Sequence, residues 1–106
     1  MACDYELTDK AAADLDETVR YISLTLGDKK AAADFLDKFE KVTDEACMFP
    51  ESGELLNNEF LPKGEFRKKY IGEYVCVYLY DKEKRKIYVI RIIYGRRDMT
   101  KQLKKL

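Results

Sequence analysis

The feature that most constrains this chain is a stretch at residues 66–98 that is rich in β-branched and tyrosine residues. Residues 74–80 and 87–94 are dense in Val, Ile, Leu and Tyr, side chains that suit a pleated, partly buried surface. Gly72 interrupts the stretch once, and the polar residues 81–86 interrupt it again. This pattern predicts an antiparallel meander of three strands.

The register of the first hairpin depends on where its turn lies. A tight turn at Ile71–Gly72 would place Lys68 opposite Val75 and Phe66 opposite Val77. Apolar residues occupy both faces of the predicted meander, so the sequence leaves open which face the helices cover.

Two helices are predicted before the meander. Thr8 is the expected N-cap of the first helix and Gly27 its end, while Asp28 starts the second helix and Pro50 ends it. Because so short a turn separates them, the helices should form an antiparallel hairpin. Each carries one apolar stripe: Ala11, Ala12, Leu15, Val19, Ile22 and Leu26 in the first, and Ala32, Phe35, Leu36, Phe39, Val42 and Ala46 in the second.

A short strand candidate at residues 3–7 precedes the helices, because Tyr5 and Leu7 alternate with acidic residues. The order strand, helix, helix and three strands predicts an α+β fold of two layers, with the helical hairpin packed on one face of an antiparallel β-sheet. We expect the first strand to join the edge of the meander. A chain of 106 residues suffices for one modest core, so we expect a single domain over residues 1–106.

The composition excludes several classes of protein. No apolar run approaches the roughly 18 residues of a membrane span, and the acidic N-terminal residues do not form a signal peptide, so we expect a cytoplasmic protein. The chain has no histidine, which removes imidazole nucleophile pairs and the usual general base. Cys3, Cys47 and Cys76 are odd in number and lie outside any C-x-x-C motif. We therefore expect reduced thiols, no metal site and no cofactor.

The formal net charge of zero hides an asymmetry along the chain. Residues 1–62 hold fifteen acidic and six basic side chains, whereas residues 63–106 hold five acidic and fourteen basic side chains. A basic C-terminal half suits a nucleic acid or an acidic protein partner. A split along the sequence does not, however, require a split in space.

Three segments share their order and spacing with a known family. They are YELTDKAAADLDETVRYISLTLG at residues 5–27, MFPESG at residues 48–53, and the meander. The residues at matching places are Leu7, Thr8, Ala11, Ala13, Asp14, Leu15, Val19, Tyr21, Ile22, Phe49, Pro50, Gly53, Arg67, Gly72, Tyr74, Tyr78, Arg97 and Asp98. Over nearly its whole length the chain resembles toxins of the RelE/ParE superfamily from type II toxin–antitoxin modules, and ParE more than RelE. It departs from the pattern at Tyr94, where many relatives carry His.

The resemblance implies a bacterial toxin that is neutralised by a cognate antitoxin in a hetero-oligomer. ParE-type members inhibit DNA gyrase and are not themselves hydrolases. RelE-type members cleave mRNA on the ribosome, using a cluster of Lys and Arg plus a Tyr or His near the C-terminus. A degenerate module that binds its antitoxin without toxicity is a third interpretation.

The residues favour the ParE mechanism within this resemblance. Lys68 and Arg97 fall on basic positions of the RelE site, and Tyr94, close to Arg97 in the sequence, is the one candidate to replace the missing proton donor. Val75 occupies the place of a catalytic Arg and Leu103 that of the C-terminal Tyr, and neither stabilises a phosphorane or transfers a proton. We therefore expect a gyrase inhibitor rather than an enzyme. The candidate residues for binding the antitoxin or the target are Arg67, Lys68, Arg91, Arg96, Arg97 and Asp98.

Overall fold

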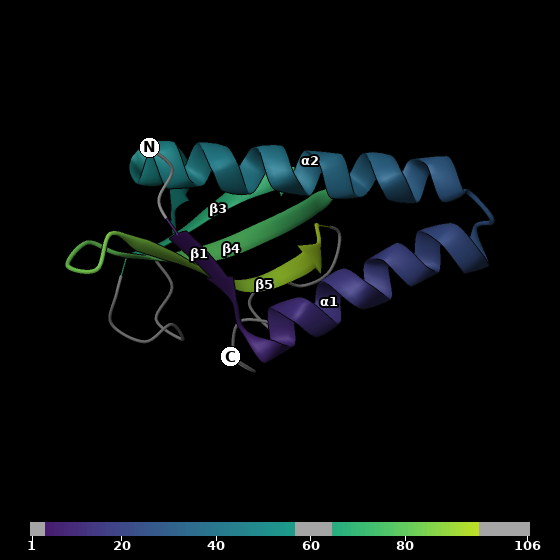
Figure 1. Cartoon of the computed structure of the whole chain (residues 1–106), viewed down its shortest axis with the longest axis horizontal. Coiled ribbons are helices and arrows are strands. Elements are labelled where there is room, and N and C mark those ends of the chain that lie inside the picture. Colours follow the sequence, from purple (N-terminus) through teal and green to yellow (C-terminus); the bar gives the residue numbers. More distant parts are fainter. Residues whose placement is uncertain (1–3, 57–64, 96–106) are drawn as a thin grey trace.

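The computed structural model describes residues 4–56 and 65–95, which form two helices and a five-stranded sheet. In chain order the elements are β1 (Asp4–Leu7), α1 (Asp9–Arg20), the π-helical turn η1 (Tyr21–Thr25), α2 (Lys29–Met48), the 3₁₀ turn η2 (Pro50–Ser52), β2 (Glu54–Leu55), β3 (Glu65–Ile71), β4 (Tyr74–Asp81) and β5 (Lys86–Tyr94). Figure 1 shows α1 and α2 converging on the turn that joins them and lying beside the sheet. This is the predicted two-layered α+β fold. In the described part of the chain, no helix is both long and apolar enough to cross a membrane.

The sheet has the strand order β1-β5-β4-β3-β2. Strands β3, β4 and β5 form the predicted antiparallel meander, and β1 joins its edge as expected. The β1–β5 pair is parallel, with Tyr5 opposite Ile87, so the complete sheet is mixed rather than antiparallel throughout. A parallel pair needs a long crossover, which the helices and the first two strands of the meander provide.

The turn between β3 and β4 lies at Gly72–Glu73, one residue later than predicted. The predicted pairs of this hairpin are therefore wrong by two positions on β4. The observed pairs are Lys68 with Val77 and Phe66 with Leu79. Gly72 has φ = +59°, a conformation that glycine adopts without steric cost and that the tight hairpin requires. A shift of two positions leaves each side chain on its predicted face.

Local hydrogen bonds place both helices where the sequence predicts them. The side-chain oxygen of Thr8 accepts a hydrogen bond from the Ala11 N–H at 3.1 Å, and Asp28 accepts one from the Ala31 N–H at 2.9 Å. Gly27 has φ = +67° and ends the first helical segment. The boundaries therefore follow from capping chemistry that the sequence displays.

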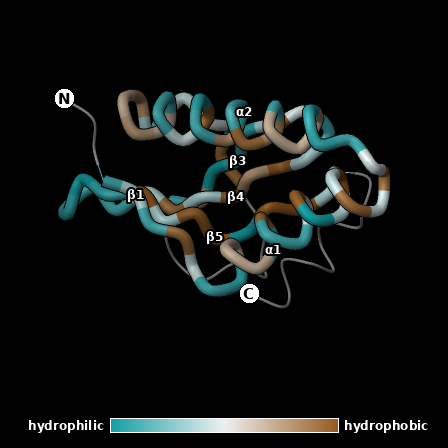
Figure 2. Tube along the Cα trace, turned by 45° about the vertical axis from the view of Figure 1, so that its right-hand side comes forward, coloured by the Kyte–Doolittle hydropathy of each residue, from teal (hydrophilic) through white to brown (hydrophobic). Residues whose placement is uncertain are grey.

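The two helical stripes meet the sheet in one core. This core consists of Ala11, Phe35, Phe39, Ile71, Cys76, Val89 and Ile92, with Leu7, Leu15, Val19, Ile22, Val42 and Tyr74 packed against it. Three predicted members of the stripes, Ala12, Leu26 and Leu36, are exposed instead. Ala12 and Leu36 lie one position beyond the stripe, about 100° around the helix. The wider turn η1 rotates Leu26 away, because a π-helical turn holds an extra residue. Figure 2 shows hydrophobic and hydrophilic residues alternating along both helices.

The sheet face away from the helices is buried as well. On this face Phe66, Val75 and Val77 are no more than 5% exposed, and Leu56, Leu79 and Ile90 pack against them. An irregularity in β5 adds Ile90 between two paired positions, which directs it to the same side. Both faces of the meander therefore bury apolar side chains, which is why the alternation of residues alone does not reveal the face that the helices cover.

The charge asymmetry of the sequence is also an asymmetry in space. The helical layer, residues 9–48, holds ten acidic and six basic side chains. The three long strands and their turns, residues 65–95, hold four acidic and eight basic side chains. The described part of the molecule thus joins an acidic helical layer to a basic sheet.

Two of the three cysteines lie in the described residues. Cys76 is a free thiol on β4 with 1% exposure, and burial raises its pKa to about 12, which keeps it neutral and unreactive. Cys47, near the end of α2, is disulfide-bonded. The prediction of reduced thiols is therefore confirmed for Cys76 and wrong for Cys47, because an odd number of cysteines still allows one pair. Cys3 lies outside the described residues.

Candidate functional site

Arg67 on β3 holds the turn that follows α2. Its guanidinium donates hydrogen bonds to the carbonyl oxygens of Glu51 at 3.0 Å and Gly53 at 2.7 Å. It also donates to the carboxylate of Glu65 at 2.9 Å. The side chain is only 14% exposed, so this predicted binding residue uses its donors within the chain.

Tyr78 lies opposite Arg67 on β4 and completes this contact. Its hydroxyl donates to the carbonyl oxygen of Pro50 at 2.8 Å and accepts from the Gly53 N–H at 3.0 Å. Tyr78 is 1% exposed, and burial raises the pKa of its hydroxyl. Four residues of the motifs found in the sequence thus form one structural contact, which fixes η2 and β2 against the sheet: Pro50, Gly53, Arg67 and Tyr78.

Arg91 on β5 binds α1. Its Nε and Nη2 donate to the two carboxylate oxygens of Asp14 at 2.7 Å and 3.1 Å, and these hydrogen bonds raise the pKa of Arg91. The same carboxylate accepts the Ile92 N–H at 3.0 Å. The two charged side chains are 12% and 14% exposed. This ion pair therefore attaches α1 to the edge of β5, beyond the short strand β1.

Lys68 and Tyr94, two of the residues expected for a ribonuclease, lie on opposite faces of the sheet. Lys68 projects from the face away from the helices, with its ammonium 3.6 Å from Glu54 and 5.6 Å from the centre of the Tyr70 ring. Tyr94 lies on the helical side, where its ring centre is 5.4 Å from that of Tyr74. The structure does not bring these two residues together.

The other predicted site positions divide between packing residues and residues outside the description. Val75, which takes the place of a catalytic Arg, is 3% exposed and packs on the face away from the helices. The remaining candidates lie outside the described residues and stay predictions: Arg96, Arg97, Asp98 and the position of Leu103.

Two arginines of the described residues are bound internally, and these residues include no candidate metal site. Within residues 4–56 and 65–95, no group of three or more His, Cys, Asp and Glu side chains could hold a metal ion. Arg67 and Arg91 are bound internally, as described above.

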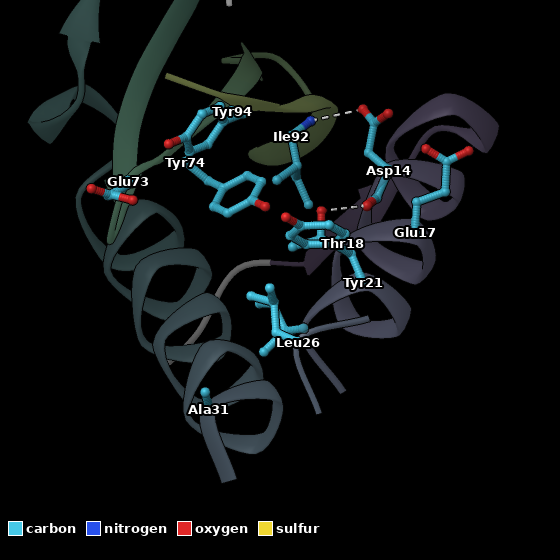
Figure 3. A pocket seen from close by; sticks show the side chains of 11 residues that line it. Asp14, Glu17, Thr18, Tyr21, Leu26, Ala31, Glu73, Tyr74, Ile92 and Tyr94 are labelled. Carbon is cyan, nitrogen blue, oxygen red and sulfur yellow. Dashed lines mark hydrogen bonds between the residues drawn. The ribbon is translucent and has the colours of Figure 1, made fainter. Parts of the chain in front are cut away.

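A cavity of about 850 Å³ opens between α1, η1 and the β3–β4 turn. In Figure 3, Tyr74 and Tyr94 on the sheet side lie across from Tyr21 and Leu26 on the helical hairpin. The lining residues are Asp14, Glu17, Thr18, Tyr21, Ile22, Leu26, Ala31, Glu73, Tyr74, Ile92 and Tyr94. Among the described residues, no Lys or Arg side chain lines this cavity.

Sequence reasoning missed this cavity because its lining comes from five separate elements, α1, η1, α2, β4 and β5, and from the turns between them. One signal was present near Gly27, where Tyr21 and Leu24 are large apolar residues outside the predicted stripe. In the structure Tyr21 is 49%, Leu24 is 74% and Leu26 is 59% exposed, so large apolar side chains near the tip of the hairpin face solvent instead of packing in the core.

Two sequence comparisons bear on the identity of this fold. A family model described as ParE toxin of type II toxin–antitoxin system, parDE, matches residues 5–99. No curated protein matches the sequence.

The structure is similar to several solved toxin structures. One is the chromosomal ParDE toxin–antitoxin system from P. aeruginosa, at 17% identity and a TM-score of 0.65, over 88% of this chain and 96% of that chain. Another is the RelBE2 toxin–antitoxin complex from Mycobacterium tuberculosis, at 18% identity and a TM-score of 0.61, over 89% of this chain and 99% of that chain. A third is an archaeal RelE–RelB complex from Pyrococcus horikoshii, at 15% identity and a TM-score of 0.56, over 92% of this chain and 100% of that chain. These likenesses establish the shared fold. The match over residues 5–99 shows that the chain belongs to the ParE toxin family of type II toxin–antitoxin systems.

Proposed function

We propose that this toxin acts in the cytoplasm as a ParE-type inhibitor of DNA gyrase and that a cognate antitoxin neutralises it in a hetero-oligomer. The family match supports the toxin class. The titles of three similar structures name a ParDE system, a RelBE2 complex and a RelE–RelB complex, which supports an antitoxin as partner of this chain.

The observation that favours gyrase over mRNA as the target is the separation of the candidate catalytic residues. A ribonuclease of this kind has to activate the 2′-hydroxyl, stabilise a pentacovalent phosphate and protonate the leaving oxygen. Lys68 and Tyr94 project from opposite faces of the sheet and are not placed to act on one phosphate. Arg67 and Arg91 hold the fold together through internal hydrogen bonds.

The remaining cations do not replace a missing general acid. Losing one general acid or base typically costs about 10²–10⁴ in rate, and losing one charge-stabilising donor costs about 10²–10³. Tyr94 packs against the Tyr74 ring and lies on the opposite face of the sheet from Lys68. An inhibitor that works by binding needs none of these groups.

The test compares two activities of the same protein. Purified protein is added to a gyrase supercoiling assay, and mRNA cleavage is mapped on translating ribosomes after induced expression. We expect loss of supercoiling with intact messages. Lys84→Ala, which removes an exposed cation of the β4–β5 turn, is the control for loss of charge and should behave as the wild type.

The ribonuclease alternative predicts the opposite pattern. Cleavage within codons that disappears in Arg97→Ala or Tyr94→Phe would overturn the gyrase proposal. If the folded protein shows neither activity and still binds its antitoxin, the chain is the non-toxic binding module that the sequence left open, and the gyrase proposal is equally wrong.

A further inference from the structure

We propose that the disulfide of Cys47 is a redox-sensitive bond between α2 and the N-terminal edge of the sheet, with Cys3 as its partner. Cys47 is disulfide-bonded, whereas Cys76 carries a free thiol. The sequence holds three cysteines, so Cys3 remains as the partner within the chain. The bond closes a loop over residues 3–47, which contains β1, α1 and nearly all of α2.

The first support is the position of Cys47 in the fold. Its side chain is 7% exposed and belongs to a buried cluster with Ala46, Tyr78 and Ile87. Ile87 is the partner of Tyr5 in the parallel β1–β5 pair, so the cluster of Cys47 adjoins the strand pair that contains β1. Figure 1 shows the C-terminal end of α2 and the start of β1 on the same side of the molecule.

The second support is the alternation of side chains along β1. Tyr5 points to the helical side of the sheet, where its ring meets that of Phe39 on α2 edge-on at 6.4 Å. Side chains two positions apart in a strand share a face, so position 3 falls on the face that α2 covers. The strand pattern therefore directs Cys3 and Cys47 into the same layer, between α2 and the sheet.

The third support is the weak attachment of β1 by its other contacts. β1 has four residues, pairs with β5 alone and is exposed at Asp4, Tyr5 and Glu6. Terminal segments tend to fray, and a parallel pair is slightly less stable than an antiparallel pair. A covalent bond at the start of β1 limits this fraying, and reduction of the bond removes the limit.

The chemistry of the switch is thiol–disulfide exchange with a small thiol such as glutathione. A glutathione thiolate attacks one sulfur of the disulfide, forms a mixed disulfide and releases the other sulfur as a thiolate, which takes up a proton. A second glutathione attacks the mixed disulfide, so the protein gains two thiols and glutathione leaves as its own disulfide. Oxidation is the reverse, in which glutathione disulfide accepts two electrons from the two cysteines.

Regulation by this bond rests on the cytoplasmic location proposed above. Cytosolic reductants keep most thiols reduced, so a disulfide in that compartment is usually transient or acts as a redox sensor. In growing cells the toxin then holds β1 loosely, and under oxidising conditions it holds β1 covalently. The switch therefore makes the stability of the toxin depend on the thiol redox state of the cell.

The test begins with full-length purified protein, equilibrated either with glutathione disulfide or with dithiothreitol. Mass spectrometry of a non-reduced digest should find Cys47 linked to Cys3 and Cys76 unlinked. The urea midpoint of the oxidised protein should be higher by at least about 1 M, because the bond restricts the unfolded chain over a long loop. A link to Cys76, or equal midpoints in the two samples, would overturn the proposal.

Two variants separate loss of the bond from loss of packing. Cys3→Ser should unfold at one midpoint with and without dithiothreitol, close to that of the reduced wild type. Cys76→Ala leaves a small cavity at a side chain that is 1% exposed, so it should be less stable, but reduction should still lower its midpoint by about the same amount as in the wild type. A response to dithiothreitol that persists in Cys3→Ser would mean that Cys3 is not the partner.

Hydrogen exchange shows whether the bond secures β1. At short exchange times, at which local opening dominates, the amides of residues 4–7 should exchange faster in the reduced wild type than in the oxidised one. Unchanged exchange at these residues would overturn the role of the bond in holding the edge strand.

Trapping the thiols in cells separates the switch from the toxin assignment. Cells that briefly express the toxin are quenched with acid, and free thiols are labelled with a maleimide polymer that slows the protein on a gel. We expect three labelled cysteines in growing cells and one after treatment with the thiol oxidant diamide. A bond that is always present or always absent would overturn the switch and leave the gyrase proposal untouched, whereas a failed gyrase assay would leave the bond in place.

Discussion

Gly53 is the residue where one added methyl group would disturb the fold most directly. A Cβ at this position would overlap the hydroxyl of Tyr78 and lie 2.9 Å from the carbonyl oxygen of Lys68. Because the Lys68 oxygen belongs to the backbone of β3, it has little freedom to move. We expect Gly53→Ala to lower the free energy of unfolding by about 1–3 kcal/mol, measured by urea denaturation.

Tyr78→Phe provides the matched comparison for this clash. It leaves the Pro50 carbonyl and the Gly53 N–H without their buried partner and should cost about 1–3 kcal/mol by itself. Since phenylalanine lacks the oxygen that the new methyl would meet, the double variant should lose less than the sum of the two single losses. Strict additivity would mean that the two groups do not collide.

Glu65 should make the protein less stable as the pH becomes acidic. Its carboxylate lies 2.9 Å from Arg67 and 3.1 Å from Lys82. The hydrogen bond from Arg67, helped by Lys82 and opposed by burial, holds the pKa of Glu65 below its ordinary value of 4.5. A carboxyl group with a lowered pKa stabilises the fold above its unfolded pKa, and this contribution is lost as the pH falls through the folded pKa.

We therefore expect the wild type to lose stability below about pH 4.5 and Glu65→Gln to lose less over the same range. Urea midpoints measured from about pH 7 to about pH 3 test this. If the urea midpoints of the two proteins fall equally as the pH is lowered, Glu65 does not contribute and other carboxylates cause the acid sensitivity.

At the scale of elements, α2 shows how sharply one helical face is buried. Phe39 is 4% exposed and meets the Tyr5 ring edge-on at 6.4 Å, while Leu36, three positions earlier, is 37% exposed. We expect Phe39→Ala to cost about 3–5 kcal/mol and Leu36→Ala less than about 1.5 kcal/mol in urea unfolding. Similar losses would place Leu36 in the core and require a rotated helix.

The elements that the sequence predicts well are those whose boundaries depend on local chemistry. Thr8, Asp28 and Gly27 cap or end helices through contacts within a few residues, and such contacts leave a signal in the sequence. The turn η1 left no such signal in the sequence, because its width depends on which carbonyl oxygen accepts the hydrogen bond of each N–H. The exposure of Leu26 was unpredictable for the same reason.

The candidate site was less predictable than the fold because its decisive contacts are distant in sequence. Arg67 and Arg91 appear in the sequence as free cations on strands. Their partners lie 14 residues away at Gly53 and 77 residues away at Asp14, and only the folded chain brings them together. The same distance hides the cavity, whose walls come from α1, η1, α2, the β3–β4 turn, β4 and β5.

At the scale of the whole molecule, the acidic helical layer and the basic sheet make association sensitive to salt. Electrostatic attraction raises association rates by about 10–10³-fold, and salt screens it over about 10 Å at 0.1 M. We expect the association rate of the antitoxin to fall by at least about tenfold between low and high salt in stopped-flow measurements. A rate that is independent of salt would mean that apolar contact alone brings the partners together.

The parallel pairing of β1 with β5 determines when the chain can complete its fold during synthesis. Residues 4–7 of β1 pair with residues 86–89, so the edge strand is made near the beginning and its partner near the end. At about 5–20 residues per second, the ribosome adds the intervening residues in about 4–16 s. During that time Phe35 and Phe39 have no complete sheet to cover them. A product that stops before Lys86 would keep these rings exposed, so incomplete copies of this toxin should be substrates for proteolysis rather than active fragments.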